Sequence, residues 1–314
     1  MIYNQLPKKF LENMYKIYPV ETVEQIVLGY QSDRPTTFRT NTIKTTTTEL
    51  TSLLDKLDIK YQPIDWYPDA FTLLSTKKTL VESEPYANGL LYVQSLSSLL
   101  PPLVLDPKEN ETILDQTAAP GSKTTQIASI MKNTGKIIAN DRHRIRLEKL
   151  KYNLKKQGVE NTVVTELQGQ EIGQKHPNFF DRTLLDAPCS LEGTFKLSYP
   201  KSYENWSGSL IEALSQRQKD LLYSAYQATK PGGTIVYSTC TLEIAENEEV
   251  INWLIKKTGN KVSIEKIDLQ IPDFIPGFTN GANQTFHPSL SNTVRLLPSE
   301  IFEGFFLAKI KKIA

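Results

Sequence analysis

Two cysteines, Cys189 and Cys240, are the residues of this 314-residue chain best suited to covalent chemistry. Cys189 lies in the motif Asp-Ala-Pro-Cys-Ser that begins at Asp186, and Cys240 lies in Ser-Thr-Cys-Thr. A lone cysteine is more often core packing than a nucleophile. Here both cysteines of the chain follow apolar runs that predict neighbouring strands, at the strand ends where an open α/β sheet binds its ligand. Their positions therefore favour a functional role.

A loop of small and polar residues, Gln116–Gly121, follows another predicted strand and precedes a helix. Small residues let backbone amides approach a ligand, and a helix N-terminus favours polar or anionic groups. The loop is no dinucleotide fingerprint, because G-x-G-x-x-G is absent. It is no P-loop either, because the Gly-Ser-Lys-Thr that begins at Gly121 lacks the earlier glycine and the unbroken G-K-[ST]. Such a loop predicts a ligand site only together with its neighbours.

Asp141 follows the next predicted strand, Lys136–Ala139. An acidic group at this place could accept hydrogen bonds from both hydroxyls of a ribose. Aspartate is also a good N-cap, and a helical pattern begins at Arg142. From the residues alone, both roles remain open.

Strands and helices alternate from residue 101 to residue 314, which is typical of an α/β, doubly wound sheet. The expected strands are Thr112–Asp115, Lys136–Ala139, Thr162–Glu166, Arg182–Leu185 and Thr234–Tyr237, and the expected helices are Arg142–Gln157, Leu210–Thr229 and Glu246–Lys257. Residues 292–297 and 304–310 could add an antiparallel pair. Residues 1–100 instead mix short helical patterns with strand-like pieces such as Pro35–Ile43, which predicts a small α+β module that ends near Pro101-Pro102.

The composition excludes several classes of protein. Lys and Arg number 36 and Asp and Glu 35, so the net charge of +1 argues against binding to nucleic acid by bulk charge alone. No apolar run is long enough for a membrane span, and the N-terminus lacks the order of a signal peptide. Two cysteines make a disulfide framework improbable, so we expect free thiols in a reducing, cytoplasmic compartment.

The motif-bearing segments resemble the signature blocks of the Sun/Fmu-type RNA (cytosine-5) methyltransferases. The resembling segments are Leu114–Thr125, Asp186–Ser190 and Ser238–Thr241, together with Arg34–Thr42, Leu91–Ser95, Arg217–Leu222 and Glu303–Phe306. The resemblance implies a Rossmann-like class I methyltransferase domain over residues 101–314. It also implies an RRM-like, RNA-binding module over residues 1–100. We expect a monomer that acts on rRNA or tRNA with S-adenosylmethionine, and needs no metal and no membrane.

The resemblance also implies a set of site residues. The loop Thr117, Ala118, Ala119, Pro120, Gly121, Ser122 and Lys123 would wrap the cofactor, with Asp141 on its ribose. Asp186 would face both cofactor and cytosine, Cys240 would be the nucleophile, and Cys189 would help to release it.

The sequence departs from the family pattern at a few positions. Thr117 and Ser122 stand where Cys and Gly are usual, and Leu191 stands where Gly is common. Gln168 replaces an acidic residue that usually contacts adenine, and its carbonyl oxygen could accept a hydrogen bond from the adenine amine.

The implied chemistry explains the need for a thiol. Carbon 5 of cytosine is a poor nucleophile until a thiolate adds at C6. An unperturbed cysteine, with a pKa of about 8.5, is mostly protonated at neutral pH, so Cys240 needs activation. Asp186, if protonated, could supply the proton that the addition requires.

Two other functions compete with this one. A DNA cytosine-5 methyltransferase would use Cys189 as its nucleophile, and a catalytically inactive RNA-binding or assembly factor would need neither thiol. Both cysteines, Asp186 and the loop are retained, which favours catalysis.

Overall fold

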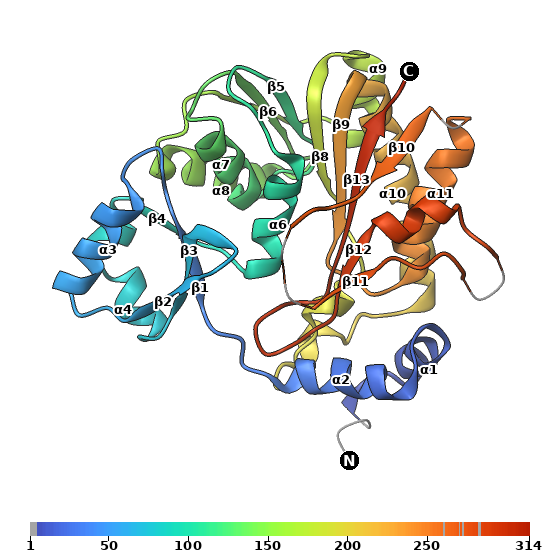
Figure 1. The fold of residues 1–314 in the computed structure, drawn as a ribbon, viewed down its shortest axis with the longest axis horizontal. Helices are drawn as coiled ribbons and strands as arrows, with labels where there is room; N and C mark the ends of the chain where they lie inside the picture. The colour runs from blue at the N-terminus through green and yellow to red at the C-terminus, as the bar shows by residue number, and fades with distance from the viewer. Residues whose placement is uncertain (1–4, 260, 270, 272, 282–283) are drawn as a thin grey trace.

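A mixed sheet of nine strands forms the centre of the protein in the computed structural model, which describes residues 5–259, 261–269, 271, 273–281 and 284–314 (Figure 1). The strands are β5 (Thr112–Asp115), β6 (Lys136–Asn140), β7 (Thr162–Thr165), β8 (Phe180–Asp186), β9 (Thr229–Thr239), β10 (Val262–Glu265), β11 (Phe274–Pro276), β12 (Val294–Leu296) and β13 (Phe305–Lys312). Their order is β11-β12-β13-β9-β8-β5-β6-β7, with β10 paired to β13. Strands β9, β8, β5, β6 and β7 are parallel, and β12, β13 and β9 pair antiparallel. The predicted doubly wound sheet and its antiparallel pair are confirmed.

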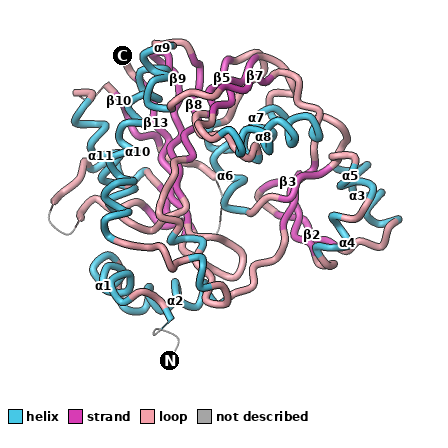
Figure 2. Tube along the Cα trace, turned by 180° about the vertical axis from the view of Figure 1, so that it is seen from behind, coloured by secondary structure: helices cyan, strands magenta, loops and turns pink. Residues whose placement is uncertain are grey.

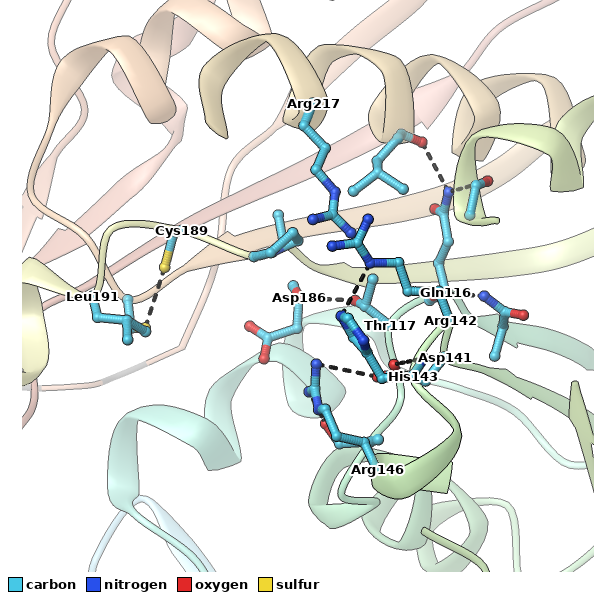
Figure 3. Close-up of a pocket in the computed structure, with 17 residues that line it drawn as sticks. Gln116, Thr117, Asp141, Arg142, His143, Arg146, Asp186, Cys189, Leu191 and Arg217 are labelled. Carbon is cyan, nitrogen blue, oxygen red and sulfur yellow. Dashed lines mark hydrogen bonds and ion pairs between the residues drawn. The ribbon is translucent and has the colours of Figure 1, made fainter. Parts of the chain in front are cut away.

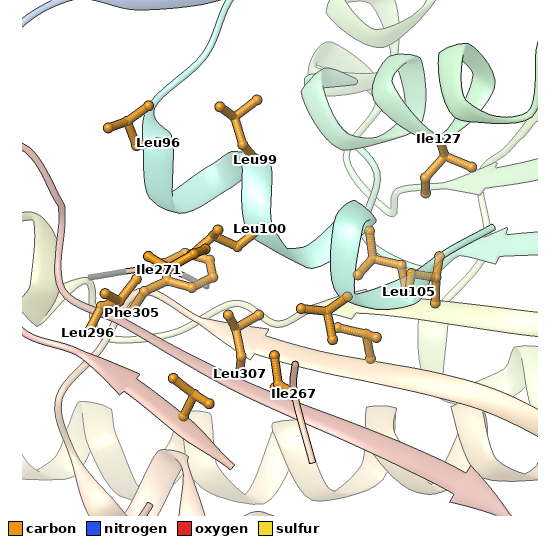
Figure 4. Packing of buried hydrophobic residues seen from close by; sticks show 14 of the residues in the cluster. Leu96, Leu99, Leu100, Leu105, Ile127, Ile267, Ile271, Leu296, Phe305 and Leu307 are labelled. Atoms are coloured by element: carbon orange, nitrogen blue, oxygen red, sulfur yellow. The ribbon is translucent and has the colours of Figure 1, made fainter. Parts of the chain in front are cut away.

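Helices cover both faces of this sheet (Figures 1 and 2). On one face lie α6 (Leu96–Leu105), α7 (Ser122–Ile130) and α8 (Arg144–Gln157), and on the other lie α9 (Ile172–Lys175), α10 (Gly208–Ala228) and α11 (Glu248–Lys257). Successive strand residues point to opposite faces. Accordingly, Leu184 packs in the hydrophobic cluster with residues of α6 and α7, whereas the next residue, Leu185, packs in the cluster with residues of α10 and α11. Figure 4 shows part of the first cluster.

Helix α6 crosses the predicted boundary at Pro101-Pro102. Both prolines lie inside the helix and are buried, so the expected boundary near residue 100 falls within a packed helix. Leu99, Leu100 and Leu105 on this helix belong to the main core cluster (Figure 4). The apolar pattern of the helix therefore outweighs the usual tendency of proline to break one.

The N-terminal module is a four-stranded sheet in the order β2-β3-β1-β4. Its elements are β1 (Thr37–Thr40), α3 (Thr47–Lys56), β2 (Tyr61–Ile64), β3 (Tyr67–Leu73), α4 (Lys77–Val81), α5 (Glu84–Ala87) and β4 (Leu91–Val93). Phe38, Leu50, Leu54 and Phe71 form its own core. The arrangement fits an RRM-like α+β module, in which a four-stranded sheet is the main element.

Two further helices of residues 1–100 pack away from that sheet. Helices α1 (Lys8–Ile17) and α2 (Val20–Gln31) lie below the nine-stranded sheet in the view of Figure 1. Phe10 of α1 packs against Phe195 and Trp206, with ring centroids 5.2 and 5.6 Å apart. Within the predicted module 1–100, only residues 37–93 build the four-stranded sheet.

Candidate active site at the ends of the parallel strands

A cavity of about 350 Å³ opens at the C-terminal ends of β5, β6, β8 and β9 (Figure 3). Of the predicted site residues, Thr117, Ala119, Asp141, Asp186, Cys189 and Cys240 line it. Sequence reasoning had not assigned Gln116, Asn140, Arg142, His143, Arg146, Ala187, Pro188, Arg217 and Leu221 to the site, but they also line it. The topology therefore brings segments far apart in the sequence to one place.

The predicted cofactor loop is held close to the strand ends by hydrogen bonds from its backbone and from the Thr117 side chain. The Ala118 N–H donates to the Asn140 carbonyl oxygen at 2.7 Å, and the Thr117 hydroxyl donates to the Asp186 carbonyl oxygen at 2.8 Å. Gly121 precedes α7 with φ 106°, a conformation that L side chains rarely adopt. A Cβ at Gly121 would lie 2.8 Å from Leu150 Cδ1, so the loop packs tightly on α8.

Asp141 lies at the end of β6 and is 4% exposed. Its carboxylate accepts a hydrogen bond from the His143 N–H at 3.0 Å and lies 3.4 Å from Arg146 Nη1. The N-cap of α8 is His143, not Asp141, and its side chain makes no capping hydrogen bond. Asp141 thus steadies the turn into α8 while it lines the cavity, which fits a carboxylate that accepts from a ribose.

Gln168 lies beside the cavity rather than on its wall. Its side chain is exposed, and the neighbouring Gly169 lines the cavity instead. Gln116 also lines it, and its amide donates to the carbonyl oxygens of Gly169 and Leu221 at 3.0 Å each. The Oε1 atom of Gln116 is buried without a partner among the described residues. Gln116 is therefore a second candidate acceptor near an adenine.

The two thiols lie close together at the strand ends, with 3.3 Å between Cys189 Sγ and Cys240 Sγ. The hydrogen bond with Cys240 raises the pKa of Cys189 well above its usual value, and burial raises it further. Cys189 therefore holds its proton more firmly than a free cysteine does, and in this state it can donate to the sulfur of Cys240. A thiol that holds its proton suits the helper of the pair rather than its nucleophile.

Asp186 is held by two donors that the sequence had not paired with it. Lys123 Nζ lies 2.6 Å from Asp186 Oδ2, and the Ser238 hydroxyl donates to Oδ1 at 2.7 Å. Lys123 also donates to the Ser98 hydroxyl at 3.0 Å. Burial lowers the pKa of Lys123, but the nearby Asp186 and Asp115 raise it more, so that the net shift is upward. A cation is thus fixed beside Asp186, which lines the same cavity as the two thiols.

Lys123 was expected to contact only the cofactor. Lys123 lies in the first turn of α7, which follows β5, and Asp186 ends β8, so their contact depends on β5 lying beside β8.

The segment after Cys189 clamps the loop that carries Cys240. The Gly193 N–H donates to the Cys240 carbonyl oxygen at 2.9 Å, and the hydroxyls of Ser190 and Thr241 are 2.7 Å apart. Glu192 is fully buried and accepts from Thr241, from the Leu242 N–H and from the Trp206 indole N–H. Burial is the main reason that its pKa rises to about 8. The two cysteine loops are therefore one supported unit.

The comparisons with known proteins agree with this geometry. The family model of the 16S rRNA methyltransferase RsmB/F matches residues 102–311, and that of the N-terminal domain of 16S rRNA methyltransferase RsmF matches residues 6–96. The chain belongs to the RsmB/F family. This family confirms the resemblance to Sun/Fmu-type enzymes, the methyltransferase class and S-adenosylmethionine as the cofactor.

Relatives named in this family act on different RNAs. The chain is 38% identical to the tRNA (cytosine(49)-C(5))-methyltransferase of Pyrococcus abyssi, over 99% of this chain and 97% of that protein. It is 35% identical to the ribosomal RNA small subunit methyltransferase F of Serratia proteamaculans, over 98% of this chain and 63% of that protein. The chain thus spans less than two thirds of the latter enzyme.

Solved structures share the fold. A methyltransferase homologue from Pyrococcus horikoshii superposes with a TM-score of 0.81 at 30% identity, covering 98% of this chain and 100% of that one. NSun6 from Pyrococcus horikoshii gives a TM-score of 0.82 at 23% identity, covering 99% of both chains. The expected class I methyltransferase fold is confirmed.

Two features are absent from the residues that the structure describes. No helix there is long and apolar enough to cross a membrane. No group of three or more His, Cys, Asp or Glu side chains there could hold a metal ion.

Proposed function

We propose that the protein methylates carbon 5 of a cytosine in rRNA or tRNA, in the cytoplasm, with Cys240 as the covalent nucleophile. The observation that carries the proposal is the pair of thiols 3.3 Å apart beside the Lys123–Asp186 ion pair. A catalytically inactive RNA-binding factor would have no need for this arrangement. The raised pKa of Cys189 also disfavours the alternative in which Cys189 attacks, as in a DNA methyltransferase.

The cavity fits the cofactor. Thr117 and Ala119 line it beside Asp141, whose carboxylate can accept from ribose hydroxyls. Gly121 lets α7 begin close to α8, which keeps the loop compact. When bound, S-adenosylmethionine supplies the methyl group.

The residues of the chain then account for the remaining steps. Cys240 loses its proton and its sulfur bonds to C6 of the base, while a proton is delivered to N3. Asp186 lines the cavity and is held by Lys123 at 2.6 Å, so Asp186 is placed to hydrogen-bond N3 and, when protonated, to deliver that proton. The addition makes C5 the nucleophilic carbon of an enamine, to which bound S-adenosylmethionine would supply the methyl group. Loss of the C5 proton to solvent restores the C5–C6 double bond and returns the electron pair of the sulfur–C6 bond to Cys240, and N3 then gives up the proton that it received.

Cys189 is placed to assist the last step. Its sulfur lies 3.3 Å from that of Cys240, so a protonated Cys189 can donate to the Cys240 sulfur as that sulfur leaves C6. A target base must be unpaired or flipped from its stack to enter such a cavity.

Covalent trapping tests the nucleophile. The wild-type protein should form a denaturant-stable adduct with 5-fluorocytosine-substituted RNA, and Cys240→Ala should bind that RNA without forming an adduct. Cys189→Ala should accumulate an adduct with unsubstituted RNA, because release is slowed. A normal adduct yield in Cys240→Ala would overturn the assignment, and normal turnover by Cys189→Ala would leave Cys189 only a structural role.

Bisulfite sequencing of total RNA from cells with and without the protein identifies the substrate. A cytosine that loses its protection in tRNA or in rRNA when the protein is absent decides between the two classes. No change in either class would contradict the proposed function.

A further inference from the structure

Helix α8 carries a stripe of alternating basic and apolar side chains on one face. Arg142, just before the helix, and Ile145, Lys149, Tyr152 and Lys156 follow one another by three or four residues, the spacing that places side chains on one side of a helix. We call these five residues the α8 stripe. Leu147, Leu150 and Leu154 form the buried face of the same helix.

The apolar members of the stripe are unusually open to solvent. Ile145 is 80% exposed and Tyr152 is 65% exposed, the two highest values among the large hydrophobic side chains of the described residues. Scattered exposed hydrophobic residues need no explanation. Two on one face, flanked by cations, form a surface that favours a partner with both flat apolar groups and negative charge.

The cations of the stripe are free of acidic partners. No ion pair joins Arg142, Lys149 or Lys156 to a carboxylate in the part of the chain that the structure describes. The one acid of the helix, Glu148, pairs with Lys151 at 2.8 Å on its flank. Because the whole chain has a net charge of only +1, RNA binding requires a local basic face, and the α8 stripe is a face of this kind.

The stripe runs from the active site to the N-terminal module. Arg142 lines the cavity near Asp141 (Figure 3). At the other end the Lys156 ammonium lies 3.6 Å from the centre of the Tyr86 ring, and the Lys156 carbonyl oxygen accepts from Lys44 Nζ at 2.7 Å. The 14 residues of α8 span about 21 Å, which leaves room for several nucleotides.

One face of the four-stranded sheet in the N-terminal module packs against the catalytic domain and is therefore closed to RNA. Single-stranded RNA commonly stacks on the open sheet of an RRM. Here Arg39 is fully buried against α7, and Ala70, its partner across the β1–β3 pair, packs in the main core with residues of α6. RNA that reaches the cavity therefore needs another surface.

We propose that the α8 stripe binds the single-stranded RNA next to the target cytosine. Arg142, Lys149 and Lys156 contact phosphates, and Tyr152 stacks on a base. The proposal rests on the proposed function and adds the path of the RNA to it. Contacts of this kind combine salt-dependent affinity with stacking that tolerates any base.

Binding of a short, labelled, single-stranded cytidine-rich RNA to the full-length protein tests the stripe. We expect Tyr152→Ala to weaken binding about tenfold, in line with the value of one stacked base, and Tyr152→Phe to bind like the wild type. Lys149→Gln should make the negative slope of log affinity against log salt concentration shallower by about 0.7, because one phosphate contact is lost. Tyr15→Ala on α1 and Lys256→Gln on α11 are matched controls at exposed positions and should change neither quantity.

Steady-state kinetics separate this proposal from the proposed function. Tyr152→Ala should raise the KM for RNA and leave kcat and the affinity for S-adenosylmethionine unchanged. Unchanged RNA affinity in Tyr152→Ala, or equal wild-type affinity for RNA and for polyglutamate, would overturn the stripe while methylation by the wild type still stands. A wild type that neither binds nor methylates RNA would remove both proposals.

Discussion

At the scale of single residues, the site works through groups whose charge is set by their neighbours. Cys189 is kept protonated by its hydrogen bond with Cys240, while the Lys123 ammonium is held by Asp186. The residue types could be read from the sequence, because motif residues at strand ends already marked both cysteines and Asp186. The pairing of Lys123 with Asp186 could not, since it depends on which strands are neighbours.

Asp141 gives the first prediction at this scale. Asp141→Ala should weaken S-adenosylmethionine binding by about 1.5–3 kcal/mol, because a charged acceptor of the ribose hydroxyls is lost. Titration calorimetry measures the effect directly. Gln168→Leu, measured in parallel, should change the affinity by less than about 1 kcal/mol, because the exposed Gln168 side chain can also bond to water. An unchanged affinity in Asp141→Ala would leave that residue only its place in the turn before α8.

Leu191 has a strained backbone at a position where glycine is common in the family. It has φ 65°, in the left-handed region that favours glycine, and it is 49% exposed at the cavity. Leu191→Gly should therefore stabilise the protein by about 1 kcal/mol, since the relief of strain exceeds the small burial that is lost. Urea denaturation measures the difference. A lower midpoint in Leu191→Gly would mean that packing of the leucine outweighs its backbone strain.

At the scale of elements, the sequence predicted the strands better than it predicted the helix and the buried acids that support the site. Strand β5 has the predicted bounds, and β6 and β7 differ by one residue. Helix α6 was missed because two prolines suggested a boundary, although buried leucines on both sides continue its pattern. Glu192 and Glu246 were missed because isolated acids give no pattern. Only the folded chain shows that they support the cysteine loops.

Glu246 gives a prediction for these supports. It accepts from the Ser190 N–H at 3.1 Å and from the Gln218 amide at 2.7 Å. Burial raises its pKa to about 7, although these hydrogen bonds oppose the shift. The native state therefore holds a proton that the unfolded state releases near pH 4.5, and the associated stability is lost as the pH rises through about 7.

Glu246→Gln removes this titration. Relative to the wild type, the variant should gain about 1–3 kcal/mol of stability between pH 5 and pH 8. Urea midpoints at the two pH values measure the change, with Glu204→Gln at an exposed position as the control. The same stability difference at both pH values would show that Glu246 is ionised throughout.

At the scale of the whole molecule, the N-terminal module is fastened to the catalytic domain by polar contacts. The Asn41 amide donates to the Gln157 carbonyl oxygen of α8 at 2.8 Å, and the Arg34 side chain donates to the Phe302 carbonyl oxygen at 2.8 Å. Composition indicated two parts of different character. It could not indicate that α1 and α2 pack on the far part, or that the module turns its sheet inward.

Arg39 is the centre of this contact. Its guanidinium is fully buried, and burial lowers its pKa. It donates to Gln94 Oε1 at 3.0 Å and to the Thr125 hydroxyl at 2.8 Å. Thr125 in turn donates to the Gly121 carbonyl oxygen at 2.8 Å, so Arg39 reaches the cofactor loop through one side chain. A buried cation with no carboxylate partner among the described ion pairs is costly unless such hydrogen bonds are all made.

Arg39→Met should therefore affect both parts of the molecule. It keeps the length of the side chain but leaves Gln94 Oε1 and the Thr125 hydroxyl without their donor, which should cost about 2–4 kcal/mol. We expect the wild type to melt in one calorimetric transition and Arg39→Met to melt in two, because the module then opens first. The affinity for S-adenosylmethionine should also fall, because Thr125, which donates to the Gly121 carbonyl oxygen, no longer receives a hydrogen bond from residue 39. Arg144→Met, at an exposed position on α8, is the control. If Arg39→Met melts in one transition, as the control should, the apolar contacts of α6 alone join the two parts.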